Sequence, residues 1–364
     1  MKRKLSNYAI FLGAFGTFLL IRLLAWFYRG QTYAYFDGAV AYGDAYKYYV
    51  PASIFYVHGG LPNVNVSQTN PEHPLLAKYI IGFFAVYLHN ANLASLLFGL
   101  ASAFIIFLLA RKIASSDVWA SVAVLLLAFD GINIILCIDP MLDTFMLFFG
   151  LLGLYLLLES HETLGFLASG FTFGLSIASK WPGAIFLVAG MVWLLLDRKF
   201  KGATAILGSA LIAYIVSYSS FILAHGFGGF FSLQLWMLNY LPQNQVVMPN
   251  LVTPVNRIIG PVFFVSTLNP LYTPFVKFGA YYLSVDIPVN PIIALLPYPV
   301  LYLQVRRGLK DKTLQLIALA AGFFIVLHTL TLDPVEAWLF APAITLTCLL
   351  TVNLIATRLH VQPT

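Results

Sequence analysis

The chain has 364 residues, of which 60% are hydrophobic and 9% are charged, and its formal net charge is +6. Because an ordinary soluble domain has about 25% charged residues, this composition excludes a single soluble globule and predicts a protein that crosses a membrane several times. The two cysteines, Cys137 and Cys348, lie in apolar runs, which excludes a disulfide framework and a cysteine metal cluster.

Apolar segments long enough to cross a bilayer predict the membrane helices. The first begins with Lys2, Arg3 and Lys4 and has no evident cleavage site, so it is expected to be a retained anchor rather than a signal peptide. The fold class that follows is an all-α polytopic bundle of about ten transmembrane helices in a single integral membrane domain, 1–364. The expected spans lie near 7–28, 93–112, 117–137, 142–159, 163–179, 181–197, 202–224, 285–305, 313–330 and 338–358.

Basic residues in short loops are expected on the cytoplasmic side of the membrane. This rule places both termini inside, together with Lys2–Lys4, Arg111–Lys112, Arg198–Lys201, Arg306–Lys312 and Arg358. Leu75–Leu88 is then expected to lie in or dip into the outer interface, because counting it as a span would move Arg111 and Lys112 outside. For the segment Arg257–Tyr282 the same two placements, as a span or at the outer interface, remain open.

This arrangement concentrates carboxylates on or near the outer face. Ionisable groups at membrane depth are costly and usually functional, so the acids at the ends of predicted spans are the strongest candidates for a site. The outer acids are Asp37, Asp44, Glu72, Asp130, Asp139, Asp143, Asp286, Asp333 and Glu336.

The first outer loop, residues 29–92, is much longer than an ordinary connection. Within it, Tyr42–Gly60 has helical spacing, with Tyr46, Tyr49, Ile54 and Val57 on one predicted apolar stripe. Tyrosines favour the boundary between membrane and water. The segment is therefore predicted to form an amphipathic helix at the outer interface.

Four motifs occur in order along the first part of the chain: an acid before the tyrosine-rich helix, "EHPLLAK", "MLDTFMLFFGLLGLYLLL" and "GFTFGLSIASKWPGAIFL". In this order they resemble the membrane domain of the dolichyl-phosphate-mannose protein mannosyltransferases. These enzymes have the GT-C glycosyltransferase fold and are related to the aminoarabinose transferases that modify lipid A. The resemblance covers a motif-bearing module of about 1–225, whereas 226–364 is similar only in hydropathy.

The resemblance implies a multi-pass enzyme of the cell membrane with its site on the outer face. It implies transfer of a sugar, mannose in the named family, from a polyprenyl or dolichyl phosphate to a hydroxyl of a protein, glycan or lipid, with inversion. A phosphate leaves as an anion and needs no general acid, so one base and cations for the phosphate are enough.

Asp44 matches the first aspartate of the family's first-loop motif and is predicted to be the general base, a role compatible with capping the following helix. Glu72 is the second predicted catalytic residue. His73 is predicted to contact substrate. Glu72 and His73 can also bind a divalent ion, but no third ligand is evident, so no metal is assigned.

Four further residues are predicted to bind substrate. Lys180, in the family's "KW" position, is expected to hold the donor phosphate with Lys78 and Arg257. The alternative for each cation is contact with lipid headgroups. Asp143 resembles the family's aspartate after two leucine-type residues, and its alternative role is capping of the helix 144–159.

The chain departs from the family pattern at Ala45, where the family has a glutamate, at Leu75, where it has a second proline, and at Ile138, where it has an arginine. The loss at Ala45 keeps open a non-catalytic family member or partner subunit. A transporter is less favoured, because the charges lie in an outer loop and the halves show no similarity. The expected partners are the lipid donor, an acceptor and membrane lipids, with no nucleic acid. A homo- or heterodimer remains open.

Overall fold

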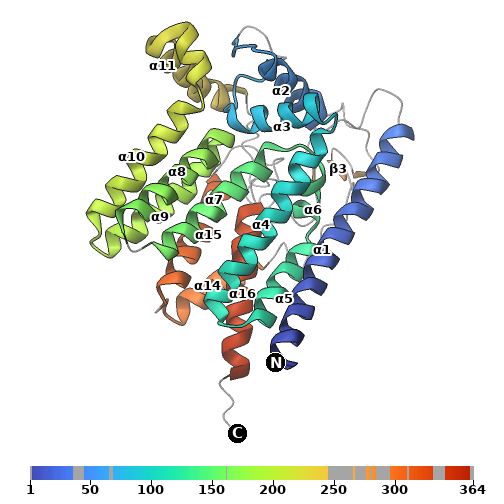
Figure 1. Ribbon diagram of the computed structural model, residues 1–364, viewed down its shortest axis with the longest axis vertical. Helices are drawn as coiled ribbons and strands as arrows, with labels where there is room; N and C mark the ends of the chain where they lie inside the picture. Colours follow the sequence, from blue (N-terminus) through green and yellow to red (C-terminus); the bar gives the residue numbers. More distant parts are fainter. Residues whose placement is uncertain are drawn as a thin grey trace. The chain divides into compact units, whose positions relative to one another are not determined.

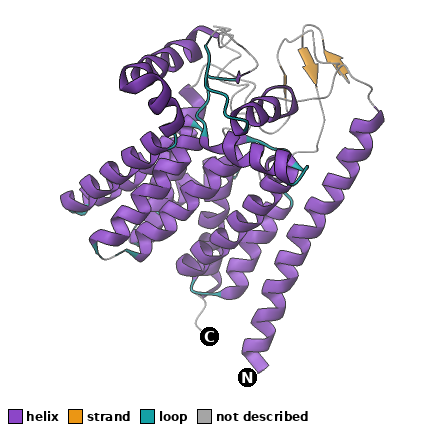
Figure 2. Ribbon diagram, turned by 45° about the horizontal axis from the view of Figure 1, so that its top comes forward, coloured by secondary structure: helices purple, strands orange, loops and turns teal. Residues whose placement is uncertain are grey.

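The computed structural model describes residues 2–35, 45–64, 69–160, 162–244, 265–266, 276–278, 281–283, 296–309, 311–330 and 341–360. The chain divides into two compact units that alternate along the sequence. Unit 1 comprises Met1–Ala41, Leu100–Ile135 and Met248–Thr364, and unit 2 comprises Tyr42–Gly99 and Leu136–Val247. Both are built mainly from helices (Figure 2). The boundary proposed from sequence at residue 225 stays a prediction.

Unit 1 gathers helices around α16 (Ala341–His360) (Figure 1), whose residues 341–353 are all buried. The helix α16 packs against α5 (Asp117–Ala128), α14 (Pro297–Arg306) and α15 (Lys312–Leu330), and α1 (Lys2–Tyr35) packs against α5. The strands β1 (Val265–Ser266), β2 (Val276–Phe278) and β3 (Tyr281–Leu283) form a small antiparallel sheet in the order β1-β3-β2. These three short strands are an addition to the expected all-α architecture.

The segment predicted as one helix, 117–137, is broken in the structure. The helix α5 ends at Ala128, and α6 (Gly131–Ile138) starts after a bend of 78°. Two buried polar groups stabilise the break. The Arg22 guanidinium donates to the carbonyls of Leu127 and Ala128 at 2.8 and 2.6 Å, and Asp130 Oδ2 accepts from the Asn133 backbone N–H at 2.9 Å. Because these groups satisfy the free ends of two helices, 117–137 is not one continuous helix, although α5 and α6 together can still form one broken span.

Unit 2 is a bundle of apolar helices with two short helices packed on it. The helix α8 (Thr163–Ser179) packs between α7 (Leu142–Glu159) and α10 (Phe200–Val216). A Cβ atom at Gly170 or Gly174 would lie 2.3 Å from a carbonyl oxygen of α10. This spacing of two glycines four residues apart lets the two backbones approach closely, which explains why "GFTFG" stands on this face.

The short helices of unit 2 come from the predicted first outer loop. The π-helix η1 (Ala45–Tyr49) leads into α2 (Val50–Val57), which packs against α3 (Leu76–Tyr87), and α3 contacts α7 and α8. Of the predicted apolar stripe, Tyr49 lies on the buried face together with Tyr56, but Ile54 is 37% exposed, so its place on that face is wrong. The hydroxyl of Tyr56 has a buried acceptor, so this tyrosine faces inward.

The rest of unit 2 connects these elements to the end of the bundle. The 3₁₀ turn η3 (Trp181–Gly183) and α9 (Ala184–Leu196) follow α8, and α11 (Ser219–Asn244) follows α10 with a non-helical residue at Gly226. The predicted span 202–224 is therefore wrong as one helix, since α10 ends at Val216.

Five helices in the described part of the chain are long and apolar enough to cross a membrane, or six if α5 and α6 form one broken span. The predicted spans 93–112, 142–159 and 163–179 correspond to α4 (Ala91–Ala114), α7 and α8. The chain is a multi-pass membrane protein of mainly helical structure. The total of about ten spans stays a prediction, because several apolar helices are shorter than 18 residues.

Candidate functional site

A buried ion pair joins the start of α7 to the end of α8 in unit 2. Asp143 lies in the first turn of α7, and Lys180 follows the last residue of α8 in an extended conformation. The Lys180 Nζ atom lies 3.0 Å from Asp143 Oδ1 and 2.9 Å from Oδ2. The side chains are 3% and 0% exposed. The pairing follows from the packing of α7 on α8, since it brings the two helix ends together.

The cap of α7 is a different residue from the one considered in the sequence. Met141 occupies the cap position and makes no side-chain hydrogen bond to the helix. Asp143 instead lies inside the first turn, where the helix dipole favours a negative charge, and both of its oxygens contact Lys180. A buried ion pair usually adds little net stability, so stability alone does not explain this pair.

The loop before α3 carries Glu72 and His73, and the side chain of Lys78 anchors it. Lys78 is fully buried, and its ammonium group donates to the backbone carbonyls of Asn70 and His73, the latter at 2.8 Å. Burial lowers the pKa of Lys78 to about 7, while the Glu72 carboxylate opposes that shift. Lys78 therefore fixes the path of the loop that presents Glu72 and His73.

Asn70 organises the same loop and was missed in the sequence. Its backbone has φ = 46°, a left-handed conformation that asparagine tolerates better than most residues. Its side-chain amide donates to Glu72 Oε1 at 2.5 Å. The pair Asn70-Pro71 is a turn signal in the sequence, so it could have indicated a structured turn at this point.

His73 connects the loop to the ion pair through electrostatics. Burial, followed by the positive charges of Lys180 and Lys78, holds the pKa of His73 well below its usual range. The imidazole therefore stays neutral. Its ring also contacts Tyr49 edge to face, with the ring centroids 5.7 Å apart. Tyr49 is a second residue of the site that the sequence assigned only to the membrane interface.

Tyr56 supports the loop from α2. Its hydroxyl donates to the carbonyl of Thr69 at 2.5 Å, and the Lys78 Nζ atom lies 5.4 Å from the centre of its ring. Burial raises the pKa of Tyr56 well above its usual value. A tyrosine that remains protonated can keep donating this hydrogen bond, so α2 and the loop are tied together at any ordinary pH.

Unit 2 thus contains Glu72, His73, Lys78, Asp143 and Lys180 of the predicted site. Asp44 and Arg257 lie outside the described residues, so the expected position of the Asp44 carboxylate near Glu72, Asp143 or Lys180 stays a prediction. Among the described residues, no group of three or more histidine, cysteine, aspartate and glutamate side chains is placed to hold a metal ion.

Comparison with known proteins supports the resemblance drawn from the motifs. The family model described as dolichyl-phosphate-mannose-protein mannosyltransferase matches residues 72–221. This range includes the loop, α3, the ion pair, α8 and α10. No curated protein matches the chain.

Two solved structures of ArnT from Cupriavidus metallidurans are similar to the whole chain. The apo structure aligns with a TM-score of 0.61 and 13% identity, covering 93% of this chain and 59% of that one. The structure bound to undecaprenyl phosphate aligns with a TM-score of 0.64 and 12% identity, covering 95% and 60%. At this identity the similarity shows the fold, which is of the GT-C type. The chain spans about 60% of the length of the ArnT chain bound to undecaprenyl phosphate.

Proposed function

We propose that this protein is a membrane glycosyltransferase that takes a sugar from a polyprenyl-phosphate donor and transfers it to an acceptor hydroxyl at the outer face of the membrane. The proposal rests first on the buried contact between Lys180 and Asp143 beside the loop of Glu72 and His73. The family model over residues 72–221 supports it, as does the fold shared with ArnT, whose structure was solved with undecaprenyl phosphate.

Lys180 is the proposed phosphate ligand. The leaving phosphate carries the electron pair of the broken sugar–oxygen bond, and a fixed cation lowers the energy of that developing charge. Asp143 holds the Lys180 ammonium through both carboxylate oxygens, so the cation is oriented before the donor arrives. Arg257 is the second proposed phosphate ligand.

Asp44 is the proposed general base. It removes the proton of the acceptor hydroxyl as the acceptor oxygen bonds to the anomeric carbon and the bond from that carbon to the phosphate breaks. One displacement of this kind inverts the anomeric centre. The neutral imidazole of His73 can donate a hydrogen bond to the acceptor or accept one from it. Glu72, its neighbour in the same loop, is the second proposed catalytic residue.

Lys78 is proposed to act through the loop that it holds. Its ammonium already donates to two backbone carbonyls from a fully buried position. A positioning role explains those contacts more directly than the phosphate contact expected from the sequence.

The test is transfer by the purified full-length protein in lipid vesicles. Polyprenyl-phosphate mannose is offered first, followed by other polyprenyl-phosphate sugars, with peptide, glycan and lipid acceptors, and products are identified by mass spectrometry. Formation of a glycosylated product that is lost in Lys180→Met supports the proposal. Absence of transfer with every donor contradicts it.

A second function, binding of the donor without transfer of the sugar, is favoured by the residue at position 45. Ala45, which stands where the family has a glutamate, is 2% exposed at the start of η1. A family member without that carboxylate can bind the donor as a partner subunit without transferring the sugar. In the same vesicles, saturable binding of the donor that depends on Lys180, without any product, would indicate this alternative.

A further inference from the structure

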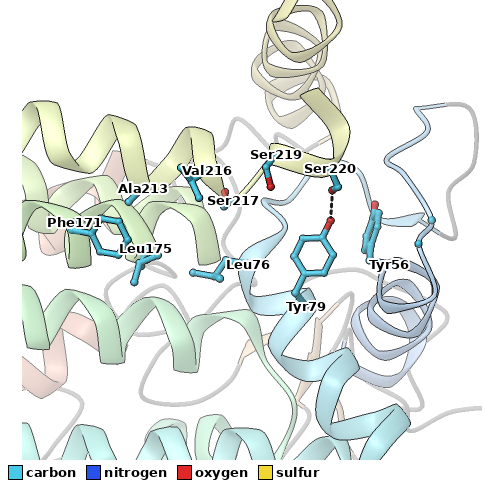
Figure 3. A pocket seen from close by; sticks show the side chains of 12 residues that line it. Tyr56, Leu76, Tyr79, Phe171, Leu175, Ala213, Val216, Ser217, Ser219 and Ser220 are labelled. Carbon is cyan, nitrogen blue, oxygen red and sulfur yellow. Dashed lines mark hydrogen bonds between the residues drawn. The ribbon is translucent and has the colours of Figure 1, made fainter. Parts of the chain in front are cut away.

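A pocket of about 380 Å³ lies in unit 2, between the two short helices α2 and α3 and the bundle helices α8, α10 and α11 (Figure 3). Its size is within the range of pockets that hold small ligands or lipid headgroups. It contains none of the predicted site residues. The residues that line it include Tyr79, Ser217, Ser219, Ser220, Phe171 and Val216.

Hydroxyl groups gather on one side of the pocket. Tyr79 of α3 points toward Ser220 at the start of α11, and their oxygens are 2.9 Å apart (Figure 3). Ser219 also lines the pocket and is exposed. Ser217, in the turn between α10 and α11, lines it as well. Because a hydroxyl can both donate and accept, this side is suited to a ligand that carries hydroxyl groups of its own.

Apolar side chains form the opposite side of the pocket and continue beyond it. Phe171 is 43% exposed and Val216 is 57% exposed, although both are large and apolar. Along α8 and α10 the same faces expose further apolar side chains, at Leu164 and Leu167 before Phe171 and at Ile212 before Val216. In a membrane protein such faces contact lipid chains, so the pocket opens onto a surface that an acyl chain can follow.

No charged side chain lines this pocket among the described residues. Bringing a phosphate into such a place without a cation is costly, whereas an uncharged headgroup loses nothing by the lack of one. The pocket therefore differs in chemistry from the surroundings of Lys180, and it does not suit the phosphate of a polyprenyl donor.

The turn after α2 closes one end of the pocket with backbone instead of side chains. Gly59 has φ = 87°, which a larger residue rarely adopts, and a Cβ atom at Gly60 would lie 2.3 Å from the ring of Phe55. The glycines thus keep this wall free of side chains. Tyr56 forms the adjacent wall and contacts Tyr79 edge to face, with ring centroids 6.2 Å apart.

We propose that this pocket binds a membrane lipid whose headgroup is uncharged and rich in hydroxyl groups, of the glycosyl diacylglycerol class. The headgroup hydroxyls contact Tyr79, Ser219 and Ser220, and one acyl chain follows the exposed apolar faces of α8 and α10. The site is additional to the transfer reaction proposed above, and its occupancy does not depend on that reaction.

The experiment measures lipid binding to the purified full-length protein in detergent by native mass spectrometry. The probes are monoglucosyl dioleoylglycerol, dioleoyl phosphatidylglycerol and free glucose. The glucolipid is expected to bind most tightly of the three. The exposed double variant Ser219→Ala/Ser220→Ala should weaken its binding by roughly fivefold, as for the loss of one or two hydrogen bonds. The pocket-filling variant Val216→Trp should weaken it at least as much.

Two matched controls on α10 separate the pocket from the general apolar surface. Leu211→Trp adds the same bulk at an exposed position outside the pocket, and Thr204→Ala removes a hydroxyl that bonds only within its own helix turn. Both should bind the glucolipid as the unmodified protein does. The proposal fails if phosphatidylglycerol binds as tightly with the same response to the variants. It also fails if glucose alone binds equally well, or if Val216→Trp and Leu211→Trp have equal effects.

Discussion

The Nζ atom of Lys180 lies within 3.0 Å of both carboxylate oxygens of Asp143, and this contact is almost fully removed from solvent. Loss of one partner of a buried pair leaves an uncompensated charge and typically costs about 3–5 kcal/mol, whereas loss of both costs less. Asp143→Asn and Lys180→Met are each expected to destabilise the protein by about this amount, and the double variant less than the sum. Unfolding by dodecyl sulfate in mixed micelles measures the four free energies.

The chain offers a matched exposed pair as the control for that cycle. Arg111 Nε lies 3.1 Å from Asp117 Oδ1, with the side chains 60% and 32% exposed. Exposed pairs contribute about 0–1 kcal/mol, so the same cycle with Arg111→Met and Asp117→Asn should give a coupling near zero. Equal coupling in the two pairs would show that burial of the Lys180–Asp143 contact has no energetic consequence.

Lys78→Met is expected to loosen the loop of Glu72 and His73. The change keeps the apolar length of the side chain but removes the donor to the carbonyls of Asn70 and His73. Leaving buried acceptors without a partner costs about 1–3 kcal/mol. The unfolding free energy should fall by that amount, and transfer activity should fall with it. Lys201→Met, at an exposed position, should change neither quantity.

His73 is expected to make the protein less stable in mild acid. Its folded pKa lies below its usual value, which is about 6.5 in an unfolded chain, so below that pH the unfolded chain binds a proton that the folded site excludes. Stability should therefore fall by up to about 1.4 kcal/mol between pH 7.5 and pH 5.5. His73→Gln should flatten this dependence. An unchanged slope in His73→Gln would contradict the neutral imidazole.

Asn70 is expected to respond to substitution through its backbone. Asn70→Ala loses the side-chain contact with Glu72 and places a Cβ-bearing residue of lower tolerance at φ = 46°. A left-handed residue of this kind costs about 1–2 kcal/mol. Asn70→Gly loses the same contact without the backbone strain, so it should be the more stable of the two. Thermal unfolding of both variants side by side checks this order.

Asp44→Asn is expected to abolish sugar transfer while leaving expression and folding intact. The change removes the proposed base and keeps the volume and capping ability of the side chain. Transfer is measured in the vesicle assay, with unfolding in mixed micelles as the folding control. Activity that persists within a few-fold would move the base to another acid, with Asp37 and Glu72 as the next candidates. Glu72→Gln should also impair transfer.

The sequence predicted the apolar helices more accurately than the contacts within the site, for physical reasons. Apolar length alone places α7 and α8 at their observed bounds, because a continuous run has only one way to satisfy its backbone in lipid. The break between α5 and α6 was not predictable in this way. It depends on Arg22 reaching carbonyls about a hundred residues later in the chain, and periodicity carries no information about such a contact.

The site shows the same division. The motifs bring Asp143 and Lys180 into consideration as separate residues, but only the packing of α7 on α8 makes them a pair. Lys78 was expected to contact a phosphate, since nothing in "HPLLAK" indicates that its ammonium is directed at the backbone of its own loop. Tyr49 and Tyr56 were assigned to the membrane interface by composition, and their inward orientation depends on acceptors and rings that only the fold supplies.

The contact of Arg22 with the end of α5 also bears on how the protein is assembled during synthesis. The guanidinium is fully buried in the finished structure, where it donates to the carbonyls of Leu127 and Ala128. A nascent chain inserts its first helix before those carbonyls exist, and an arginine in an apolar span is unfavourable until it finds acceptors. The first helix therefore enters the membrane before its arginine has these acceptors, and it reaches its final environment only after α5 has been made.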